Sequence, residues 1–223
     1  MEFDVNHLIE FLPEINLAFM QTLYMIAIAL FVAVMIGLPV GILLFVTDKG
    51  LFWENRIINQ VIGFIVNMIR SIPFIILLVA LIPFTVWLVD SMIGPTAASV
   101  SLSVAAIPFF ARLVETAFRK IDYGVIEAAI AAGGTPWMII KDVLLPEAKS
   151  GIISGITITV VSLVGTSAIA GTVGGGGIGD LAIRFGYYRY DDTIMITTVV
   201  ILIVFVQLIQ LIGDKIAKVV DKK

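Results

Sequence analysis

The chemically reactive side chains of this sequence are few, and they exclude most kinds of catalysis. The chain has no cysteine and a single histidine, His7, so it lacks thiol chemistry and the partners that a histidine needs to bind a metal. No G-x-x-x-x-G-K-[ST] loop is present, which excludes ATP hydrolysis by that route. The basic residues are too dispersed for nucleic-acid binding. We therefore predict no catalytic and no metal-binding residues, and we expect His7 to be a solvated surface residue.

The residue types and spacing between 122 and 146 point instead to a docking element. Asp122 can cap a short helix, and Gly133-Gly134 can end it. Thr135-Pro136 is typical of the start of a second short helix, which Pro146 should stop. Such a polar helix-loop-helix between long apolar runs predicts a surface that binds a protein in the water.

This segment resembles the EAA loop of ATP-binding-cassette (ABC) importer permeases. The family pattern is E-A-A, three residues, G, nine residues, an aliphatic residue, one residue, then L-P. The matching residues here, with Gly134 beside them, are Glu127, Ala128, Ala129, Gly133, Val143, Leu145 and Pro146. An interfacial amphipathic helix with small residues is the alternative. The resemblance implies that a cytoplasmic ATPase binds the loop, and that ATP and Mg²⁺ are bound by this partner, so this chain needs no cofactor.

The rest of the chain is too apolar for a soluble domain of its size, with 60% hydrophobic and 14% charged residues. A membrane-spanning helix needs about 20 apolar residues. Five segments qualify: 15–47, 57–89, 91–111, 150–173 and 193–213. We therefore predict an all-α polytopic membrane protein with about five transmembrane helices. Residues 1–223 form one permease domain, which contains the loop 122–146.

Lysine and arginine orient these segments through the positive-inside rule. Most of them fall on one side, namely Lys49, Arg56, Arg119, Lys120, Lys141, Lys149, Lys215, Lys218, Lys222 and Lys223. The other side carries Arg184 and Arg189. We expect the loop and the C-terminus in the cytoplasm and the N-terminus outside, in a bacterial cell membrane. The acidic N-terminus is not typical of a signal peptide, so the first segment should drive insertion.

Breaks and one charge within the segments are candidates for a translocation path. Gly37, Pro39 and Gly41 should interrupt the first segment, and prolines also occur in the second and third. Arg70 lies roughly 20 Å into the second segment, where a charge costs at least ~2.5 kcal/mol unless it is paired or hydrated. We interpret Arg70, Ser71 and Pro73 as part of a gate or helix anchor. Snorkelling of arginine and purely structural prolines are the alternatives. Glu115, three residues after Arg112, can pair with that second arginine.

The fourth segment has small residues from 165 to 171 with one bulky side chain, Ile169, among them. If two copies meet at a two-fold axis, paired Ile169 side chains could close a pore that Thr166 and Ser167 help to line. Ordinary helix packing is the alternative. The glycines at 174, 176 and 179 formally match a dinucleotide-binding pattern, but no βαβ unit surrounds them. We expect a flexible outer loop there.

Beyond the loop, residues 70–78, 82–85, 108–112 and 165–179 are similar to those of the methionine-importer permease subfamily. The resemblance implies a homodimeric permease with two copies of a cytoplasmic ABC ATPase and an extracytoplasmic substrate-binding protein, for L- and D-methionine. A permease for another small amino acid or peptide is an alternative, and a nucleotide-independent channel or scaffold is another. Because the spans offer few polar groups for a zwitterion, we expect the permease to bind substrate weakly.

Overall fold

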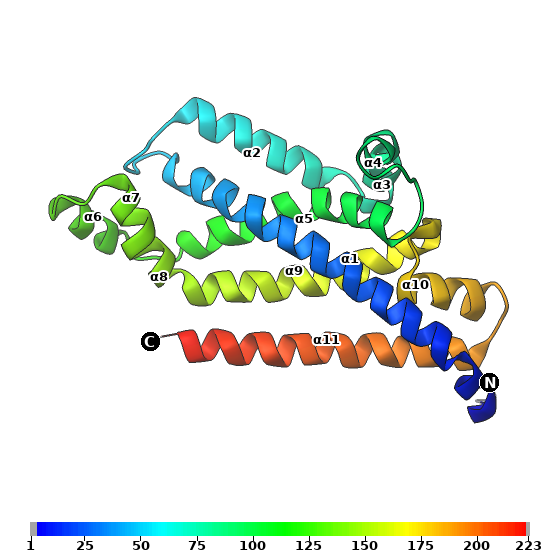
Figure 1. Cartoon of the computed structure of the whole chain (residues 1–223). Coiled ribbons are helices and arrows are strands. Elements are labelled where there is room, and N and C mark those ends of the chain that lie inside the picture. Colours follow the sequence, from blue (N-terminus) through cyan, green and yellow to red (C-terminus); the bar gives the residue numbers. More distant parts are fainter. Residues whose placement is uncertain (1–3, 222–223) are drawn as a thin grey trace.

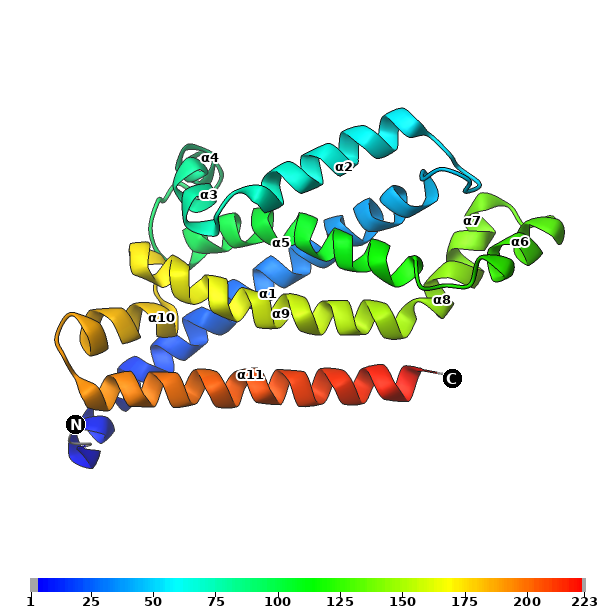
Figure 2. The same cartoon turned by 180° about the vertical axis from the view of Figure 1, so that it is seen from behind.

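The computed structural model describes residues 4–221, and it is built from long helices that run side by side (Figures 1 and 2). The four longest are α1 (Val5–Val46), α5 (Pro95–Phe118), α9 (Lys149–Ala170) and α11 (Asp192–Val220). Between α1 and α5 lie α2 (Arg56–Ser71), α3 (Phe74–Ala80) and α4 (Ile82–Val89). Between α5 and α9 lie α6 (Tyr123–Ala131), α7 (Pro136–Met138), the π-helix η1 (Ile139–Leu144) and α8 (Leu145–Glu147). Between α9 and α11 lie η2 (Gly171–Gly175), α10 (Gly177–Leu181) and η3 (Ala182–Tyr187).

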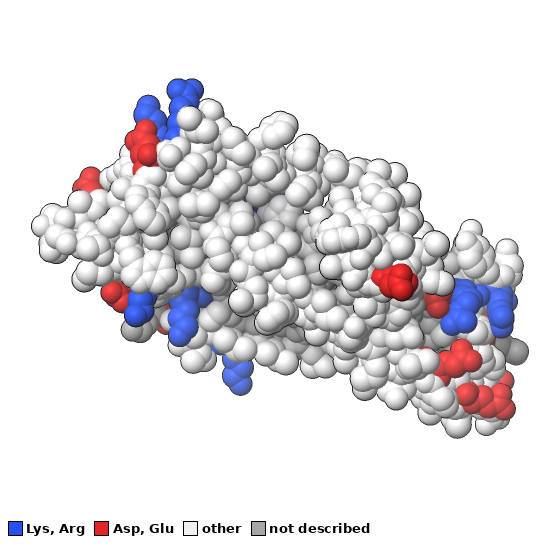
Figure 3. Space-filling model, turned by 45° about the horizontal axis from the view of Figure 1, so that its top comes forward, with Lys and Arg blue, Asp and Glu red and all other residues white. Residues whose placement is uncertain are grey.

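These helices agree with the predicted all-α membrane protein. Within the described residues, four helices are long and apolar enough to cross a membrane, and α2 with α3 makes a fifth if the bent pair counts as one span. The N- and C-terminal ends lie at opposite ends of the molecule (Figure 1). On the face drawn in Figure 3, charged side chains gather towards the two ends and the broad middle is nearly free of them. This distribution suits a protein whose middle lies in lipid.

The first segment is not interrupted, contrary to expectation. α1 continues through Gly37, Pro39 and Gly41, and the two glycines serve its packing against α5 instead. A Cβ at Gly41 would lie 2.6 Å from the carbonyl oxygen of Ala111, and one at Gly37 would lie 2.8 Å from that of Ile107. Pro39 removes one backbone donor, but the long contact with α5 holds the helix on both sides of it.

The second segment is broken just beyond Arg70, as expected. α2 and α3 meet at an angle of 104° across Ile72 and Pro73. Ile72 is extended, with φ −83° and ψ 125°, because the ring of a following proline disfavours the helical conformation of the residue before it. The segment therefore does not cross as one straight rod.

Pro146 does not stop the second short helix, which is a correction to the sequence analysis. The chain stays helical from α7 through η1 and past Pro146 to Glu147, and the turn residue Ala148 then separates α8 from α9. Pro146 lies in the first turn of α8, where a proline is tolerated, and the wider π-helical turn just before it changes the hydrogen-bond register.

The glycine-rich stretch is also different from the flexible loop that we expected. It folds into η2 and α10, which turn back against α9 so closely that a Cβ at Gly179 would lie 2.3 Å from the Cα of Ala168. Two side chains of α1 cap α10: Gln21 Oε1 accepts from the Gly177 N–H and Thr22 Oγ1 from the Ile178 N–H, both at 2.9 Å. The glycines therefore permit close packing, not flexibility.

His7 is not simply solvated. Its Nε2 lies 2.7 Å from Oδ2 of Asp191, and its ring packs on Phe11. Asp191 also caps α11 by accepting from the Ile194 N–H at 3.1 Å. The pair thus ties the start of α1 to the start of α11, which are far apart in the sequence.

Candidate functional site

The segment 122–146 forms the predicted helix-loop-helix. Asp122 caps α6 by accepting from the Gly124 N–H at 2.8 Å, and Thr135 Oγ1 accepts from the Met138 N–H at 3.4 Å to start α7. Between them Gly133 has φ +81°, a conformation that L side chains rarely adopt. In Figure 1 this element projects from the end of the molecule where the C-terminus lies.

Four aliphatic side chains anchor the element to the helix bundle. Ile126, Ile139, Ile140 and Leu144 are each at most 3% exposed and belong to the main hydrophobic core. The sequence analysis did not single them out, although the aliphatic pair 139–140 in a polar segment was a usable signal. Of the predicted docking residues, Glu127, Ala128, Gly133 and Pro146 are exposed, whereas Ala129, Gly134, Val143 and Leu145 are partly buried.

The outer surface of this element is apolar as well as polar. Large hydrophobic side chains stand 40–67% exposed on α6 and α7, namely Tyr123, Val125, Ile130, Trp137 and Met138. We call these five side chains the apolar tip. Exposed apolar groups gathered on one element indicate a surface for another protein. The sequence analysis missed them too, since their exposure depends on which face of each helix meets the bundle.

A chain of polar contacts connects this element with α1, α5 and α2. The Tyr123 hydroxyl donates to the Gly50 carbonyl in the connection after α1. Arg119 lies 2.7 Å from Asp48 in the same connection and 2.8 Å from Glu115 on α5. Arg112 forms the predicted salt bridge with Glu115, at 2.5 Å. It also donates a hydrogen bond to the amide oxygen of Asn67 on α2 at 2.9 Å. Glu115 is buried, so the two arginines compensate its charge.

The same polar contacts shift the pKa values of Asp48 and Arg119. Partial burial acts to raise the pKa of Asp48, but hydrogen bonds from Arg119 and from the Lys49 N–H outweigh it, and the pKa falls below its usual value. For Arg119, burial acts to lower the pKa, whereas the hydrogen bonds to Glu115 and Asp48 raise it above its usual value. Both groups are therefore held charged in the folded protein.

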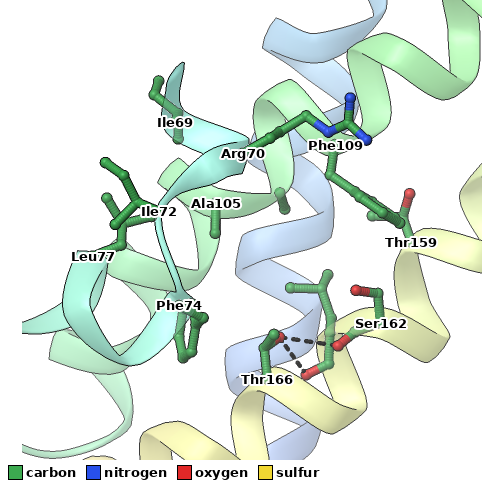
Figure 4. Close-up of a pocket in the computed structure, with 12 residues that line it drawn as sticks. Ile69, Arg70, Ile72, Phe74, Leu77, Ala105, Phe109, Thr159, Ser162 and Thr166 are labelled. Carbon is green, nitrogen blue, oxygen red and sulfur yellow. Dashed lines mark hydrogen bonds between the residues drawn. The ribbon is translucent and has the colours of Figure 1, made fainter. Parts of the chain in front are cut away.

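A cavity of about 320 Å³ lies between the α2–α3 bend, α5 and α9 (Figure 4). Arg70, at the end of α2, faces it together with Thr166 of α9. Pro73 makes the bend beside the cavity, and the Ser71 hydroxyl donates to the Asn67 carbonyl at 2.8 Å. The sequence analysis missed two more polar side chains of α9 that line the cavity, Thr159 and Ser162. Their spacing from Thr166 on one helix face was a usable signal.

The other predicted gate residues lie away from this cavity. Ser167 is 2% exposed, and its hydroxyl donates to the Val164 carbonyl at 2.8 Å. Ile169 is 42% exposed on the surface of the single chain, close to the end of α9. The structure thus brings Arg70 and Thr166 together but leaves Ile169 on an outer face.

Comparison with known proteins places these features in a family. Residues 37–223 match the family described as "Binding-protein-dependent transport system inner membrane component". The chain is 52% identical over 203 residues to a probable D-methionine transport system permease protein, MetI, of Vibrio cholerae, which covers 91% of this chain and 90% of the relative. It is 44% identical over 181 residues to the methionine import system permease protein MetP of Bacillus subtilis, covering 81% and 82% of the two chains.

A solved structure agrees with these relatives. A chain from inward-facing conformations of the MetNI methionine ABC transporter has a TM-score of 0.94 and 45% identity, covering 96% of this chain and 99% of that one. A chain from an amino acid ABC transporter, at 20% identity and a TM-score of 0.80, shows the shared fold alone. The chain belongs to the family of binding-protein-dependent transport system inner membrane components.

Proposed function

We propose that this family member is the membrane permease subunit of an ATP-driven importer of methionine, in its L and D forms. The observation that carries the proposal is the apolar tip on an ordered element anchored to the bundle core. A permease without a nucleotide-binding site of its own needs a surface at which an ATPase can bind and transmit its conformational change. The curated relatives named as methionine permeases support the substrate.

The proposed assembly is a homodimer of this chain with two copies of a cytoplasmic ATPase and an extracytoplasmic binding protein. The likeness to a chain of the MetNI methionine ABC transporter supports a complex of this kind. In this arrangement α6 and α7 face the cytoplasm and the N-terminus faces outward, which the distribution of lysine and arginine favours. Glu127, Ala128, Ala129, Gly133 and Gly134 then contribute to the docking surface, with small side chains that allow close approach.

The polar chain from Tyr123 to Asn67 supports a mechanism of alternating access. A displacement of α6 by the ATPase acts directly on the connection after α1 through Gly50 and, through Arg119, Glu115 and Arg112, on α2. Hydrogen-bond and salt-bridge networks of this kind can carry a shift from one element to another. The cavity beside Arg70 is lined in part by α2 and α5, two elements that such a shift would move.

Uptake by whole cells tests the substrate. A strain that lacks its own methionine permease should import radiolabelled methionine when this chain is supplied together with its ATPase and binding protein. Excess unlabelled L- or D-methionine should abolish the signal, and other amino acids should not. Import of a different amino acid instead would contradict the substrate, and absence of any ATP-dependent import would contradict the transporter class.

Copurification tests the docking surface. Trp137→Glu should abolish retention of the ATPase on the tagged permease, because it places a charge in the apolar tip. Tyr188→Glu is the matched control, since Tyr188 is 71% exposed, comparable with 67% for Trp137, but lies after η3 near the start of α11. Equal retention by both variants would exclude the apolar tip as the ATPase site.

A further inference from the structure

One arginine beside the cavity, Arg70, forms no ion pair within residues 4–221, and its side chain is exposed in the single chain. Arg70 follows the first residue of α2 by 14 positions, about 21 Å along the helix, so it lies far from that end of the bundle. Among the residues that the structure describes, none forms a hydrogen bond or an ion pair with its guanidinium, whereas Arg112 and Arg119 are both paired. The one acidic residue of α5, Glu115, is already shared by those two arginines. Arg70 instead faces the cavity (Figure 4).

The α9 wall of the cavity offers hydrogen-bond acceptors. Thr159, Ser162 and Thr166 lie on one face of α9, three and four residues apart. Thr159 is fully buried, whereas Ser162 and Thr166 are partly exposed. The Thr166 hydroxyl donates to the Ser162 carbonyl at 3.0 Å, so its oxygen is left able only to accept. These groups suit a donor such as an ammonium.

Apolar side chains also line the cavity. They include Phe74 and Leu77 of α3 and Phe109 of α5, and the cavity volume of about 320 Å³ is at the lower end of the range of small-molecule sites. A cation, hydroxyl acceptors and aromatic rings around one cavity together match an α-amino acid with an uncharged side chain.

We propose that this cavity is a transient α-amino-acid site, in which Arg70 binds the carboxylate and the hydroxyl oxygens of Ser162 and Thr166 accept hydrogen bonds from the ammonium. Phe74 and Phe109 contact the apolar side chain of the substrate. The inference rests on the proposed function and deepens it, since it places part of the substrate recognition within the permease. The carboxylate meets a full charge, whereas the ammonium meets only neutral oxygens, so the affinity is low. Low affinity suits a site that a substrate occupies only in passing.

Ligand-observed NMR on the purified permease–ATPase complex, without the binding protein, tests the site. Methionine should give a saturable signal, and methioninamide, which lacks the carboxylate, should compete about tenfold less well or worse, as loss of a charge-assisted hydrogen bond predicts. Arg70→Gln should weaken methionine binding by a similar factor, and Arg70→Lys should retain part of it. Arg56→Gln, on the exposed first residue of the same helix, is the matched control and should bind like the parent.

A second variant tests the α9 wall. Thr166→Val should weaken methionine but not 4-(methylthio)butanoate, which lacks the ammonium. The proposal is overturned if the amide competes as well as methionine, if Arg70→Gln binds like the parent, or if the parent shows no saturable methionine signal. In each of these cases methionine import by the full system would still uphold the proposed function. Loss of methionine import by the parent would instead refute that function.

Discussion

At the level of single residues, the turn between α6 and α7 uses two glycines for different reasons. Gly133 supplies a positive φ in open space, whereas Gly134 supplies room, since its Cβ would lie 2.8 Å from the Ala129 carbonyl oxygen. Gly134→Val should therefore displace α7 at a cost of about 1–3 kcal/mol and reduce ATPase copurification severalfold. Gly165→Val is the control, because a Cβ at Gly165 meets no atom within 4 Å and this residue lies on α9, outside the segment 122–146. If both variants retain the ATPase equally, the spacing at Gly134 does not matter for docking.

A second prediction for a single residue concerns the loss of stability at low pH through Asp191. Burial acts to raise the pKa of Asp191, but the hydrogen bonds from His7 and from the Ile194 N–H outweigh it and lower the pKa below its usual value. A lowered folded-state pKa means that the stabilisation is present above the unfolded value, about pH 4, and is lost as the pH falls through the folded value. Asp191→Ala should also remove the helix cap, at a cost of about 1 kcal/mol.

Thermal unfolding in detergent from pH 7 to pH 3 measures this contribution. The parent and Asp191→Ala should differ at neutral pH and converge at the acid end. Asp191→Asn, which keeps a capping side chain, should lie between them. Curves that remain parallel down to pH 3 would contradict a role for the ionised carboxylate.

The contacts of a single residue could be predicted from the sequence where its partner is a near neighbour along the chain. The Asp122 and Thr135 caps and the Arg112–Glu115 pair depend on neighbours two or three positions away, and the structure confirms them. The partner of His7, Asp191, lies 184 residues further along the chain. Nothing in the local spacing could bring His7 to Asp191, so this contact was missed.

At the level of elements, the contact between α1 and α5 requires an absence of side chains at Gly37 and Gly41. Gly41→Val would place atoms within 2.7 Å of the Val114 Cβ and the Ala111 backbone, so it should push the two helices apart. We expect a loss of about 1–3 kcal/mol, visible as a lower apparent melting temperature and lower membrane yield. Gly63→Ala is the control, because the nearest atoms to its Cβ lie at 3.7 Å. Similar loss in both variants would mean that any added helix side chain is harmful.

Element boundaries were predictable where a backbone rule is strict and unpredictable where packing overrides it. The bend at Pro73 follows from the conformation that a proline imposes on Ile72. Pro39 and Pro146 have the same chemistry but leave their helices continuous, because α5 supports one and a π-helical turn accommodates the other. The glycine-rich stretch was predicted to be flexible for a similar reason, since only tertiary structure shows what a glycine approaches.

At the level of the whole molecule, the exposed face around Ile169 leads to a prediction for the assembled transporter. If this face lines the axis of the proposed homodimer, Ile169→Ala should widen the path and raise basal ATPase activity or passive methionine leak severalfold. Alanine keeps the helix intact, so the change reports on side-chain bulk. Val200→Ala, on the exposed face of α11, is the control. Leak and basal ATPase at the parental level would assign Ile169 to packing only.

The bent second segment also has a consequence for biosynthesis. α2 is 16 residues long, about 24 Å, which is shorter than a hydrocarbon core of about 30 Å, and in the folded chain it buries only Gly63 and Val66. It carries Asn67 and Arg70, whereas the arginine that binds Asn67 belongs to α5, which the ribosome makes later. α2 is therefore too short and too polar to remain in lipid alone, and the apolar residues of α3 must contribute to its insertion. We expect nascent chains truncated after residue 71 to lose α2 to the aqueous side and be degraded by membrane proteases, and chains extended through residue 118 to retain it.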